Sequence, residues 1–325
     1  MSKFLKALIS ATLAAVSLTT IQQTVAQATP GPFGCTPDFY QASNGDMYHL
    51  DISSYQYTTM AGNSNVNGLN AIGYNTADNF IYGIDGNSDL VKVFDDGSHS
   101  APIATTGVTP KGTGGTFIAP NRMLTSNTSG SFTTLDLGTN PPTVADFTDT
   151  GTAWAAADIA FYPALKTAYG LDGNTLYVAT FDSGLTTLDV STKTFTNNFN
   201  SRDAWGAAYV DRDGNGYFFD NATSDLYEVP AAILQSASAT ITATLLNAST
   251  TLTSPNDGAS CPDALAPMAA TPSPTPTPSA QPPAPTYPVY FDGNGGGPNP
   301  PTQSYNSNIC FALPDGPSRP GYTFV

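Results

Sequence analysis

The sequence predicts an all-β fold, a β-propeller of about five four-stranded blades, with six blades as the alternative count. Two observations support this prediction. Short apolar runs alternate with turns rich in Gly, Asn and Asp along residues 32–264. Equivalent positions in these runs return at intervals of 41 to 53 residues, a spacing in the range of propeller blades.

The repeat unit is clearest in residues 204–229. Three apolar runs there, at 207–210, 217–219 and 226–229, suit β-strands by length and composition. The turn at 211–216 contains Gly and short polar residues, which tolerate the positive φ of tight hairpins, so antiparallel neighbours in a meander are expected. The same order of strands is expected at 69–75, 80–85 and 90–95; at 116–119, 122–125 and 132–137; and at 158–162, 176–181 and 185–190, the last copy being lengthened by 166–173.

One anchor residue near the end of each third strand marks the register of the repeat. The anchors are Leu50, Phe94, Leu135, Leu188 and Val229, spaced by 44, 41, 53 and 41 residues. One more β-prone segment follows each anchor, which gives four strands per unit. These segments are 55–60, 101–106, 143–147, 194–199 and 240–246.

The first unit has no inner strand before Phe39, and residues 256–261 belong to no unit. A ring closes if this late segment supplies the missing strand, and closure removes the exposed sheet edges that invite aggregation. Cys35 and Cys261 would then be neighbours, and a disulfide between them would lock the ring. An open β-repeat array is the alternative if Cys35 is free or bonded to Cys310.

The other segments predict export and display. Residues 1–28 have the charged, apolar and small-x-small regions of a secretory signal peptide, and no segment is apolar enough for a membrane span. The domain at 32–264 is followed by a Pro-, Thr- and Ser-rich linker at 265–286, whose composition favours an extended chain. Residues 287–325 begin a small second module. We therefore expect the chain to be secreted, in the extracellular space or at a cell surface.

Charge and residue usage exclude some classes of function. Without residues 1–28 the formal net charge is about −17, and such a surface repels nucleic acid and anionic lipid. The two histidines, His49 and His99, have no Ser or Cys signature near them, which argues against a nucleophilic triad. Glu228 is the one Glu of the chain, so a glycosidase would have to use Asp for its two carboxylates.

The end of the chain contains Val-Tyr-Phe-Asp-Gly-Asn-Gly-Gly at 289–296 and Arg-Pro-Gly-Tyr-Thr-Phe at 319–324. With these motifs, residues 287–325 resemble a Listeria–Bacteroides, or internalin B-type, repeat of bacterial surface proteins. The resemblance implies a small β-grasp-like module. The copy is incomplete, because the family's Gly-Trp and last strand are missing, and Cys310 is unusual for it. We expect either that the chain continues beyond Val325 in the whole protein or that this repeat does not fold alone.

Further motifs lie near the ends and in the first repeat of the larger domain. They are Pro-Phe-Gly-Cys at 32–35, Asn-Ala-Ile-Gly-Tyr-Asn at 70–75, Asp-Asn-Phe-Ile-Tyr-Gly-Ile at 78–84 and Asn-Asp-Gly-Ala-Ser-Cys at 256–261. With them, residues 32–264 resemble an uncharacterised domain family of secreted bacterial proteins. The resemblance implies a propeller-like domain on exported or surface proteins, and no established activity.

The two tryptophans suggest a binding site. Trp154 and Trp205 each precede an inner strand in adjacent copies, so both are expected on one face of the propeller near its axis, where loops commonly bind ligands. Together with Asp158, Arg202 and Asp203 they would form a stacking platform for a sugar or a peptide. The alternative is that both indoles pack between blades.

One turn resembles a cation-binding loop. Asp211, Asp213 and Asn215, followed by Gly, match the first half of a calcium loop, whose oxygens at alternate positions can surround one ion. Position twelve of that loop is Ala222 instead of the usual bidentate Glu. A plain hairpin turn is the alternative, and no cofactor other than this weak calcium site is predicted.

We therefore expect an exported, non-enzymatic binding or adhesion protein whose partner is an extracellular glycan or a surface protein. One alternative is a propeller enzyme that acts on extracellular polysaccharide, which requires two or three Asp in one pocket, at least one with a raised pKa. A purely structural surface module is the other alternative, and it predicts no pocket.

Overall fold

The computed structural model describes residues 30–51, 55–62, 66–196, 205–246, 256–265, 286–289, 302–306 and 321. The chain divides into two compact units, Met1–Ala269 and Ala270–Val325. In the second unit, β22 (Thr286–Val289) and β23 (Gln303–Asn306) form one antiparallel pair. The predicted signal peptide, nearly all of the linker and most of the predicted internalin B-type repeat lie outside the described residues, so these three assignments stay predictions.

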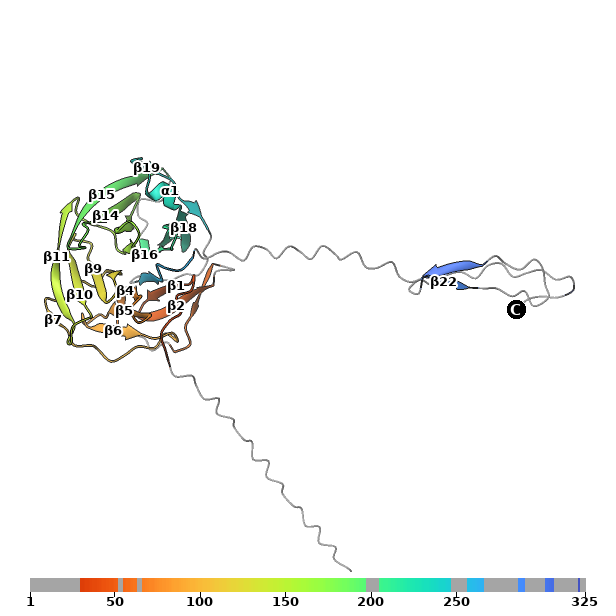
Figure 1. Cartoon of the computed structure of the whole chain (residues 1–325), viewed down its shortest axis with the longest axis horizontal. Coiled ribbons are helices and arrows are strands. Elements are labelled where there is room, and N and C mark those ends of the chain that lie inside the picture. Colours follow the sequence, from red (N-terminus) through yellow and green to blue (C-terminus); the bar gives the residue numbers. More distant parts are fainter. Residues whose placement is uncertain are drawn as a thin grey trace, which may run out of the picture. The chain divides into compact units, whose positions relative to one another are not determined.

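The first unit is a ring of β-sheets, which confirms the predicted all-β propeller (Figure 1). Its described strands form four sheets, the largest of which has ten strands; we divide that sheet at a parallel strand pair and so describe five blades, written from the axis outward. Blade 1 consists of β21 (Asn256–Ser260), β1 (Phe39–Ser43), β2 (Asp46–Asp51) and β3 (Gln56–Thr59). Blade 2 consists of β4 (Asn70–Asn75), β5 (Phe80–Ile84) and β6 (Leu90–Val93). Blade 3 consists of β8 (Gly114–Ala119), β9 (Arg122–Ser126), β10 (Phe132–Asp136) and β11 (Thr143–Gly151). Blade 4 is β12 (Ala160–Tyr162), β13 (Thr167–Asp172), β14 (Thr175–Phe181) and β15 (Thr187–Phe195); blade 5 is β16 (Trp205–Val210), β17 (Gly216–Asp220), β18 (Asp225–Val229) and β20 (Thr244–Leu245).

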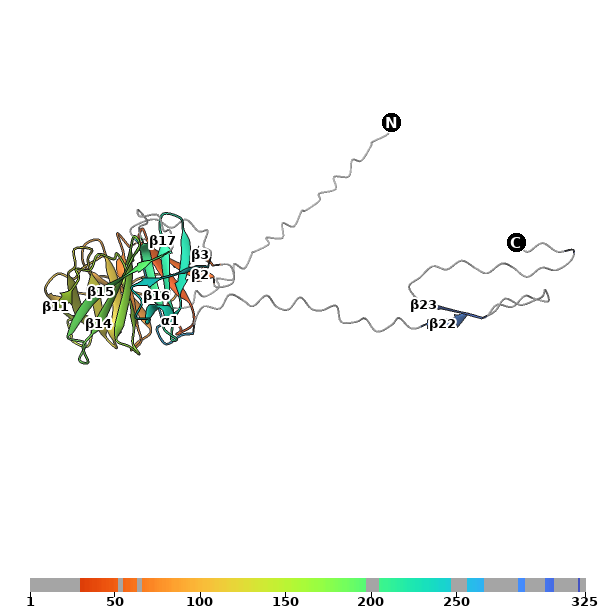
Figure 2. The same ribbon diagram turned by 90° about the horizontal axis from the view of Figure 1, so that it is seen from above.

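The inner strands close the ring around its axis. In the order β21, β4, β8, β12 and β16, each inner strand contacts the next, and β16 contacts β21 again. Small residues permit this approach, because a Cβ atom at Gly115 would lie 2.3 Å from the carbonyl carbon of Ala71. Seen from the side, strands such as β14 and β17 run across the thickness of the ring (Figure 2).

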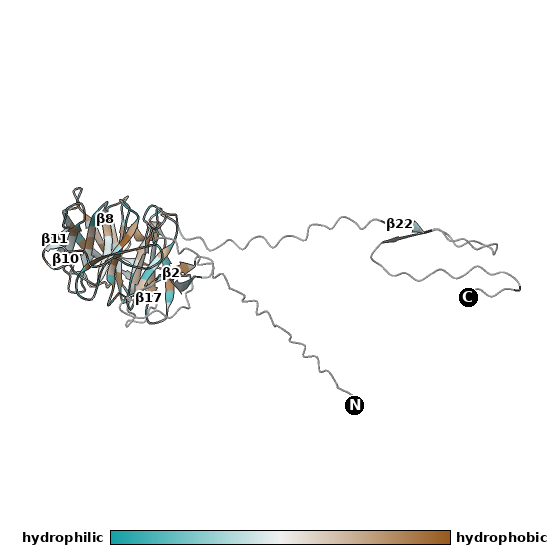
Figure 3. Ribbon diagram, turned by 90° about the horizontal axis from the view of Figure 1, so that it is seen from below, coloured by the Kyte–Doolittle hydropathy of each residue, from teal (hydrophilic) through white to brown (hydrophobic). Residues whose placement is uncertain are grey.

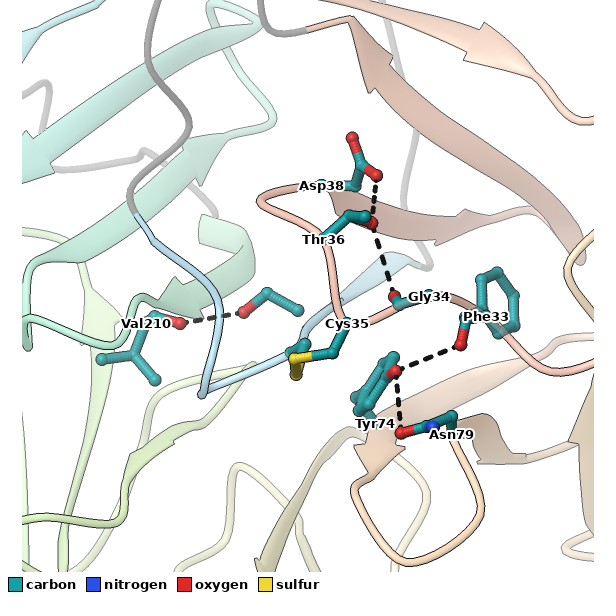
Figure 4. Close-up of a disulfide and its surroundings, with 10 residues drawn as sticks. Phe33, Gly34, Cys35, Thr36, Asp38, Tyr74, Asn79 and Val210 are labelled. Carbon is teal, nitrogen blue, oxygen red and sulfur yellow. Dashed lines mark hydrogen bonds between the residues drawn. A yellow bond between two sulfur atoms is a disulfide. The ribbon is translucent and has the colours of Figure 1, made fainter.

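The late segment of the domain supplies the inner strand of blade 1, as predicted. β21 pairs antiparallel with β1, with Gln41 opposite Gly258. Cys35 and Cys261 form a disulfide with 5.3 Å between their Cα atoms (Figure 4). The strand pairing and the disulfide therefore close the ring at the same place, which confirms both predictions.

The core of the ring lies between its blades. In the described residues there are five hydrophobic clusters, and each joins two neighbouring blades. Between blades 5 and 1, for example, the rings of Phe39 and Tyr209 stack with their centroids 4.3 Å apart. Brown, hydrophobic segments occur on strands throughout the ring (Figure 3). Burial on both faces of each sheet makes the blades mutually dependent for their stability.

Parallel pairings at the outer edge join neighbouring blades. The short strand β7 (Thr106–Gly107) pairs with β11, β11 pairs with β15, and β15 pairs with β19 (Thr240–Ile241). Gly107 and Gly151 occupy matching places in this belt and have φ of 103° and 85°. A Cβ atom at either position would lie within 2.3 Å of a valine carbonyl oxygen on the partner strand, so the backbones touch there.

Several predicted outer strands need correction. The segment 101–106 makes an isolated bridge through Ile103 and ends in β7, which belongs to the belt. The segment 240–246 splits into β19, on blade 4, and β20, on blade 5. The segment 194–199 starts within β15, and residues 197–199 lie outside the described ones.

The predicted register of blade 4 is also wrong. Residues 166–173 contain β13, a buried second strand that pairs with both β12 and β14, and are no insertion. The predicted second strand is therefore the third strand, β14, and Leu188 lies on the fourth strand, β15. This shift explains why the anchor spacing before Leu188 is 53 residues.

Candidate functional site

The inner strands all end on one face of the ring, which we call the hairpin face. The turns there include 76–79, 120–121, 163–166 and 211–215. They are bonded to one another: the side chain of Asn75 donates to Oδ1 of Asn121 at 3.0 Å and accepts from its backbone N–H at 3.0 Å. The N–H of Arg212 donates to the carbonyl of Ala264 at 2.7 Å. These bonds fix the turns of different blades relative to one another.

The segment around the disulfide lies beside Tyr74 and Asn79 of blade 2 (Figure 4). The Tyr74 hydroxyl points at Asn79 Oδ1, 3.2 Å away, and at the carbonyl of Phe33, 3.4 Å away. The Phe33 N–H donates to the Asn79 carbonyl at 2.7 Å. Together these bonds anchor the start of the domain to the hairpin of blade 2 and hold the ring of Tyr74 in place.

The hairpin face contains a cavity of about 340 Å³ across blades 2, 3 and 4, which we call the hairpin-face cavity. This volume is at the lower end of the range for small-ligand sites. Its apolar wall consists of Tyr74, Phe117, Ile118, Ala119, Pro120, Phe161, Pro163, Leu185 and Pro262. Its polar lining side chains are those of Thr76, Lys166 and Asp263.

A second, narrower space, the axial hollow, adjoins this cavity. Tyr74, Phe117, Phe161 and Pro262 line both spaces, so the two spaces lie side by side at these residues. The axial hollow has a volume of about 20 Å³, enough for one water-sized group. Small residues of the inner strands line it, namely Gly73, Gly115, Ala160, Ala208 and Gly258.

Two buried carboxylates adjoin the axial hollow. Asp158 and Asp257 are 3% and 0% exposed and are hydrogen-bonded to each other. Asp158 accepts backbone N–H bonds from Ile159, Ala208 and Gly258, three residues that line the hollow.

Asp257 completes this network. It accepts from the N–H of Ile72 at 2.5 Å and from that of Gly258 at 3.0 Å. The pair therefore satisfies amides on β4, β16 and β21 and just before β12, which ties four blades together at the axis.

Burial sets the protonation of this pair. Desolvation raises the pKa of Asp158 to about 6, against the backbone hydrogen bonds that lower it. Desolvation also raises the pKa of Asp257 well above its usual value, and the charge of Asp158 adds to that shift. Two adjacent carboxylates cannot both ionise cheaply, so the pair shares one proton and carries one negative charge.

This pair only partly fits the arrangement that a hydrolase would need. Two Asp do converge, and their pKa values are raised. Their oxygens are occupied by backbone amides, however, and neither residue lines the hairpin-face cavity. The pair thus holds the inner strands together, and its geometry offers no carboxylate to a ligand in the cavity.

The predicted tryptophan platform is not formed. Trp154 is 0% exposed, belongs to the cluster between blades 3 and 4, and donates from Nε1 to the carbonyl of Ala156 at 2.9 Å. Trp205 is 3% exposed, belongs to the cluster between blades 4 and 5, and donates to the carbonyl of Gly173 at 2.8 Å. A stacking platform needs exposed rings, whereas these indoles pack between blades. Asp158 is buried at the axis, and Arg202 and Asp203 lie outside the described residues.

The predicted calcium loop is a hairpin turn. Oδ1 of Asp211 accepts the N–H groups of Asp213 and Asn215, each at 2.9 Å. Oδ2 accepts from the Asn215 amide at 2.8 Å and from the Tyr217 hydroxyl at 2.9 Å. The carboxylate that would bind the ion therefore serves the turn itself. In the part of the chain that the structure describes, no three His, Cys, Asp or Glu side chains form a metal-binding group.

Sequence reasoning missed the hairpin-face cavity, although a signal was present. Pro120 and Pro163 directly follow the inner strands β8 and β12, and Pro262 follows β21 by two residues. A proline that recurs just after the inner strand places rigid apolar rings at the same end of neighbouring blades. This recurrence could have indicated an apolar site on that face.

Comparisons with known proteins give a family and likenesses of fold. A family model described as "Repeat of unknown function (DUF6923)" matches residues 12–263, and no curated protein matches the chain. The chain is similar to a functionally unknown protein from Desulfotomaculum acetoxidans, with 14% identity over 69% of this chain and 77% of that one and a TM-score of 0.40. It is similar to an auxiliary nutrient binding protein from Bacteroides thetaiotaomicron, with 12% identity over 60% of this chain, about half (52%) of that one, and a TM-score of 0.41. It is also similar to the Cps50 (Swd1) β-propeller domain of Myceliophteria thermophila, with 7% identity over 65% and 86% of the two chains and a TM-score of 0.39.

The family match ends at residue 263, so the resemblance of residues 287–325 to an internalin B-type repeat stays a prediction. Among the described residues no helix has the length and apolar character needed to cross a membrane.

Proposed function

The chain belongs to the family described as a repeat of unknown function (DUF6923), and from that premise we propose that it is an exported, non-enzymatic binding or adhesion protein of a bacterial cell surface. In this proposal the ring binds an extracellular partner in the hairpin-face cavity, and the linker at 265–286 displays it. The predicted signal peptide at 1–28 and the resemblance of residues 287–325 to a surface-protein repeat support the location. The Cys35–Cys261 disulfide also supports it, since disulfides persist in oxidising compartments.

The hairpin-face cavity is the observation that supports binding. It combines buried aromatic floor residues, such as Phe161, with exposed rim residues, such as Pro163, on turns that are bonded to one another. A preformed apolar concavity with few polar groups is the usual form of a ligand site. A purely structural module predicts no such cavity, so the cavity favours binding over that alternative.

Two matched leucines test the proposal. Leu185 lines the cavity, whereas Leu165, which is 48% exposed, lies on the neighbouring hairpin and does not line it. The full chain is expressed with its own N-terminus in a bacterium, and mass spectrometry of the culture medium checks for the mature protein lacking residues 1–28. The labelled protein is then applied to bacterial cells, peptide arrays and glycan arrays. We expect Leu185→Glu to abolish binding and Leu165→Glu to leave it unchanged; equal binding by both variants would refute the cavity as the site.

The competing hypothesis is an enzyme that cleaves extracellular polysaccharide with Asp carboxylates. It is tested by incubating the exported protein with polysaccharides and assaying for new reducing ends. We expect none above the level of a medium control. Cleavage that Asp158→Asn removes, while the variant stays folded, would overturn the non-enzymatic proposal.

A further inference from the structure

The hairpin-face cavity and the axial hollow together indicate a class of ligand. We propose that they bind a primary ammonium group on an apolar chain, specifically the lysine side chain of a partner polypeptide flanked by apolar residues. This inference rests on the proposed binding function and specifies its ligand. It is argued from the wall of the cavity, the end of the hollow and the charges at the rim.

The wall of the cavity selects an apolar ligand body. Phe117 and Phe161 are 7% and 3% exposed and offer no hydrogen bond, and the three rim prolines lack an N–H group. A sugar in this space would leave most of its hydroxyl groups unpaired, which is costly for each group. Apolar side chains of a peptide meet no such cost.

The inner end of the site selects a cation. The axial hollow accepts one water-sized group, and an ammonium group has that size. Three aromatic residues, Tyr74, Phe117 and Phe161, line both the cavity and the hollow, and aromatic rings attract cations. Behind the wall of the hollow lies the buried Asp158–Asp257 pair, which accepts the N–H of the lining residue Gly258, and a carboxylate there would attract an ammonium group.

The rim adds one group of each sign. Asp263 is exposed and lines the cavity, so it favours a cationic ligand. Lys166 also lines it and opposes a cation, although its ammonium group is held by the carbonyl of Ser183 at 2.7 Å. The whole chain carries a formal net charge of −15, which attracts cationic partners over longer distances.

The test uses three tripeptides that differ in one side chain. Acetyl-Leu-Lys-Phe-amide carries the ammonium group, and the same peptide with norleucine or glutamate at its centre is neutral or anionic. Binding to the full exported chain is measured by calorimetry. We expect the lysine peptide to bind about tenfold more tightly than the norleucine peptide, since it adds a cation–π contact at a partly desolvated site. The glutamate peptide should bind most weakly.

Variants of the two charged rim residues should change the affinity for the lysine peptide in opposite directions. Asp263→Asn should weaken the lysine peptide about two- to fivefold, and Lys166→Met should strengthen it by a similar factor, as expected for partly exposed charges. Asp146→Asn removes the same charge from an exposed position on β11 and should have no effect.

The outcomes separate the ligand class from the site. If the three peptides bind equally and Leu185→Glu abolishes all binding, the cavity is the site and the cationic ligand is wrong. If no peptide binds, the ligand class is overturned as well, whereas the proposed function depends on the array and cell-binding results. If free 4-phenylbutylamine binds more tightly than the lysine peptide, the natural ligand is a free amine and the polypeptide partner is wrong.

Discussion

The buried carboxylate pair predicts an unusual dependence of stability on pH. Most native carboxylates have lowered pKa values, so proteins usually lose stability as the pH falls. Here the pKa of Asp158 is raised to about 6 and that of Asp257 is raised further above its usual value, in both cases chiefly by burial. The folded chain therefore keeps protons that the unfolded chain releases near pH 4. The stability that these protons contribute is present in full below about pH 4 and is lost as the pH rises through the folded pKa values.

The magnitude follows from the number of protons. Each proton that the folded pair keeps and the unfolded chain has lost makes the free energy of unfolding fall by about 1.4 kcal/mol per pH unit, until the pH passes the raised pKa of the group that holds the proton. Asp257→Asn replaces the proton-sharing carboxyl by an amide, which cannot titrate but can still donate to Asp158. The variant loses an acceptor for the Ile72 or the Gly258 N–H, so it should be less stable than the native chain at pH 6. Its free energy of unfolding should no longer fall with rising pH because of the shared proton.

The assay is urea unfolding at pH 6, 7 and 8 with the disulfide intact, followed by circular dichroism. The informative quantity is the difference in slope between the native chain and Asp257→Asn, because every other ionisable group is the same in both. Asp146→Asn, at an exposed position, is the control and should keep the native slope. Equal slopes for the native chain and Asp257→Asn would refute the shared proton.

Three further predictions concern the ring. Replacing Cys35 and Cys261 by Ser should lower the free energy of unfolding by up to about 5 kcal/mol by chain-entropy reasoning, since the bond spans 226 residues, and thermal melts with and without reductant would check it. Gly151→Ala should lower the free energy of unfolding in urea by about 2–4 kcal/mol, because φ is 85° and the Cβ atom would lie 2.3 Å from the Val190 carbonyl oxygen. Gly112→Ala is the control: its Cβ atom would lie 3.7 Å from the nearest atom, so the free energy of unfolding should change by less than about 1 kcal/mol. Both tryptophans should resist acrylamide quenching in the folded chain; ready quenching of either would contradict their burial.

Local pattern was sufficient to predict most of the ring. Strands and hairpins followed from apolar runs and turn residues, and closure followed from counting: one unit lacked an inner strand, and the segment 256–261 lacked a unit. The register of blade 4 failed because β13, β14 and β15 are all β-prone and the turn at Gly173 and Asn174 is short, so any two adjacent strands of the three satisfy the pattern. The belt of parallel pairings was not predictable, since β7 and β19 have two residues each.

The candidate site was harder to predict than the fold because it depends on side-chain burial. Tryptophan suits a sugar-binding face and an interior equally well, and only the packing of neighbouring blades decides between them. The sequence places Asp158 near Trp154, yet the role of Asp158 depends on Asp257, 99 positions later, which only the closed ring brings to it. Residues that come together through ring closure leave no local pattern for a single sequence to show.

The cavity itself follows from small differences between otherwise equivalent turns. In blade 5 the turn at 211–215 is stabilised by Asp211, and it packs so tightly that a Cβ atom at Gly214 would lie 2.8 Å from the ring of Tyr162. That side of the hairpin face is therefore filled. Blades 3 and 4 instead turn at Pro120 and Pro163, whose rings border the space over Phe117 and Phe161. Changes confined to these turns would therefore alter the lining of the cavity and leave in place the inner strands, the carboxylate pair and the disulfide, which hold the ring together.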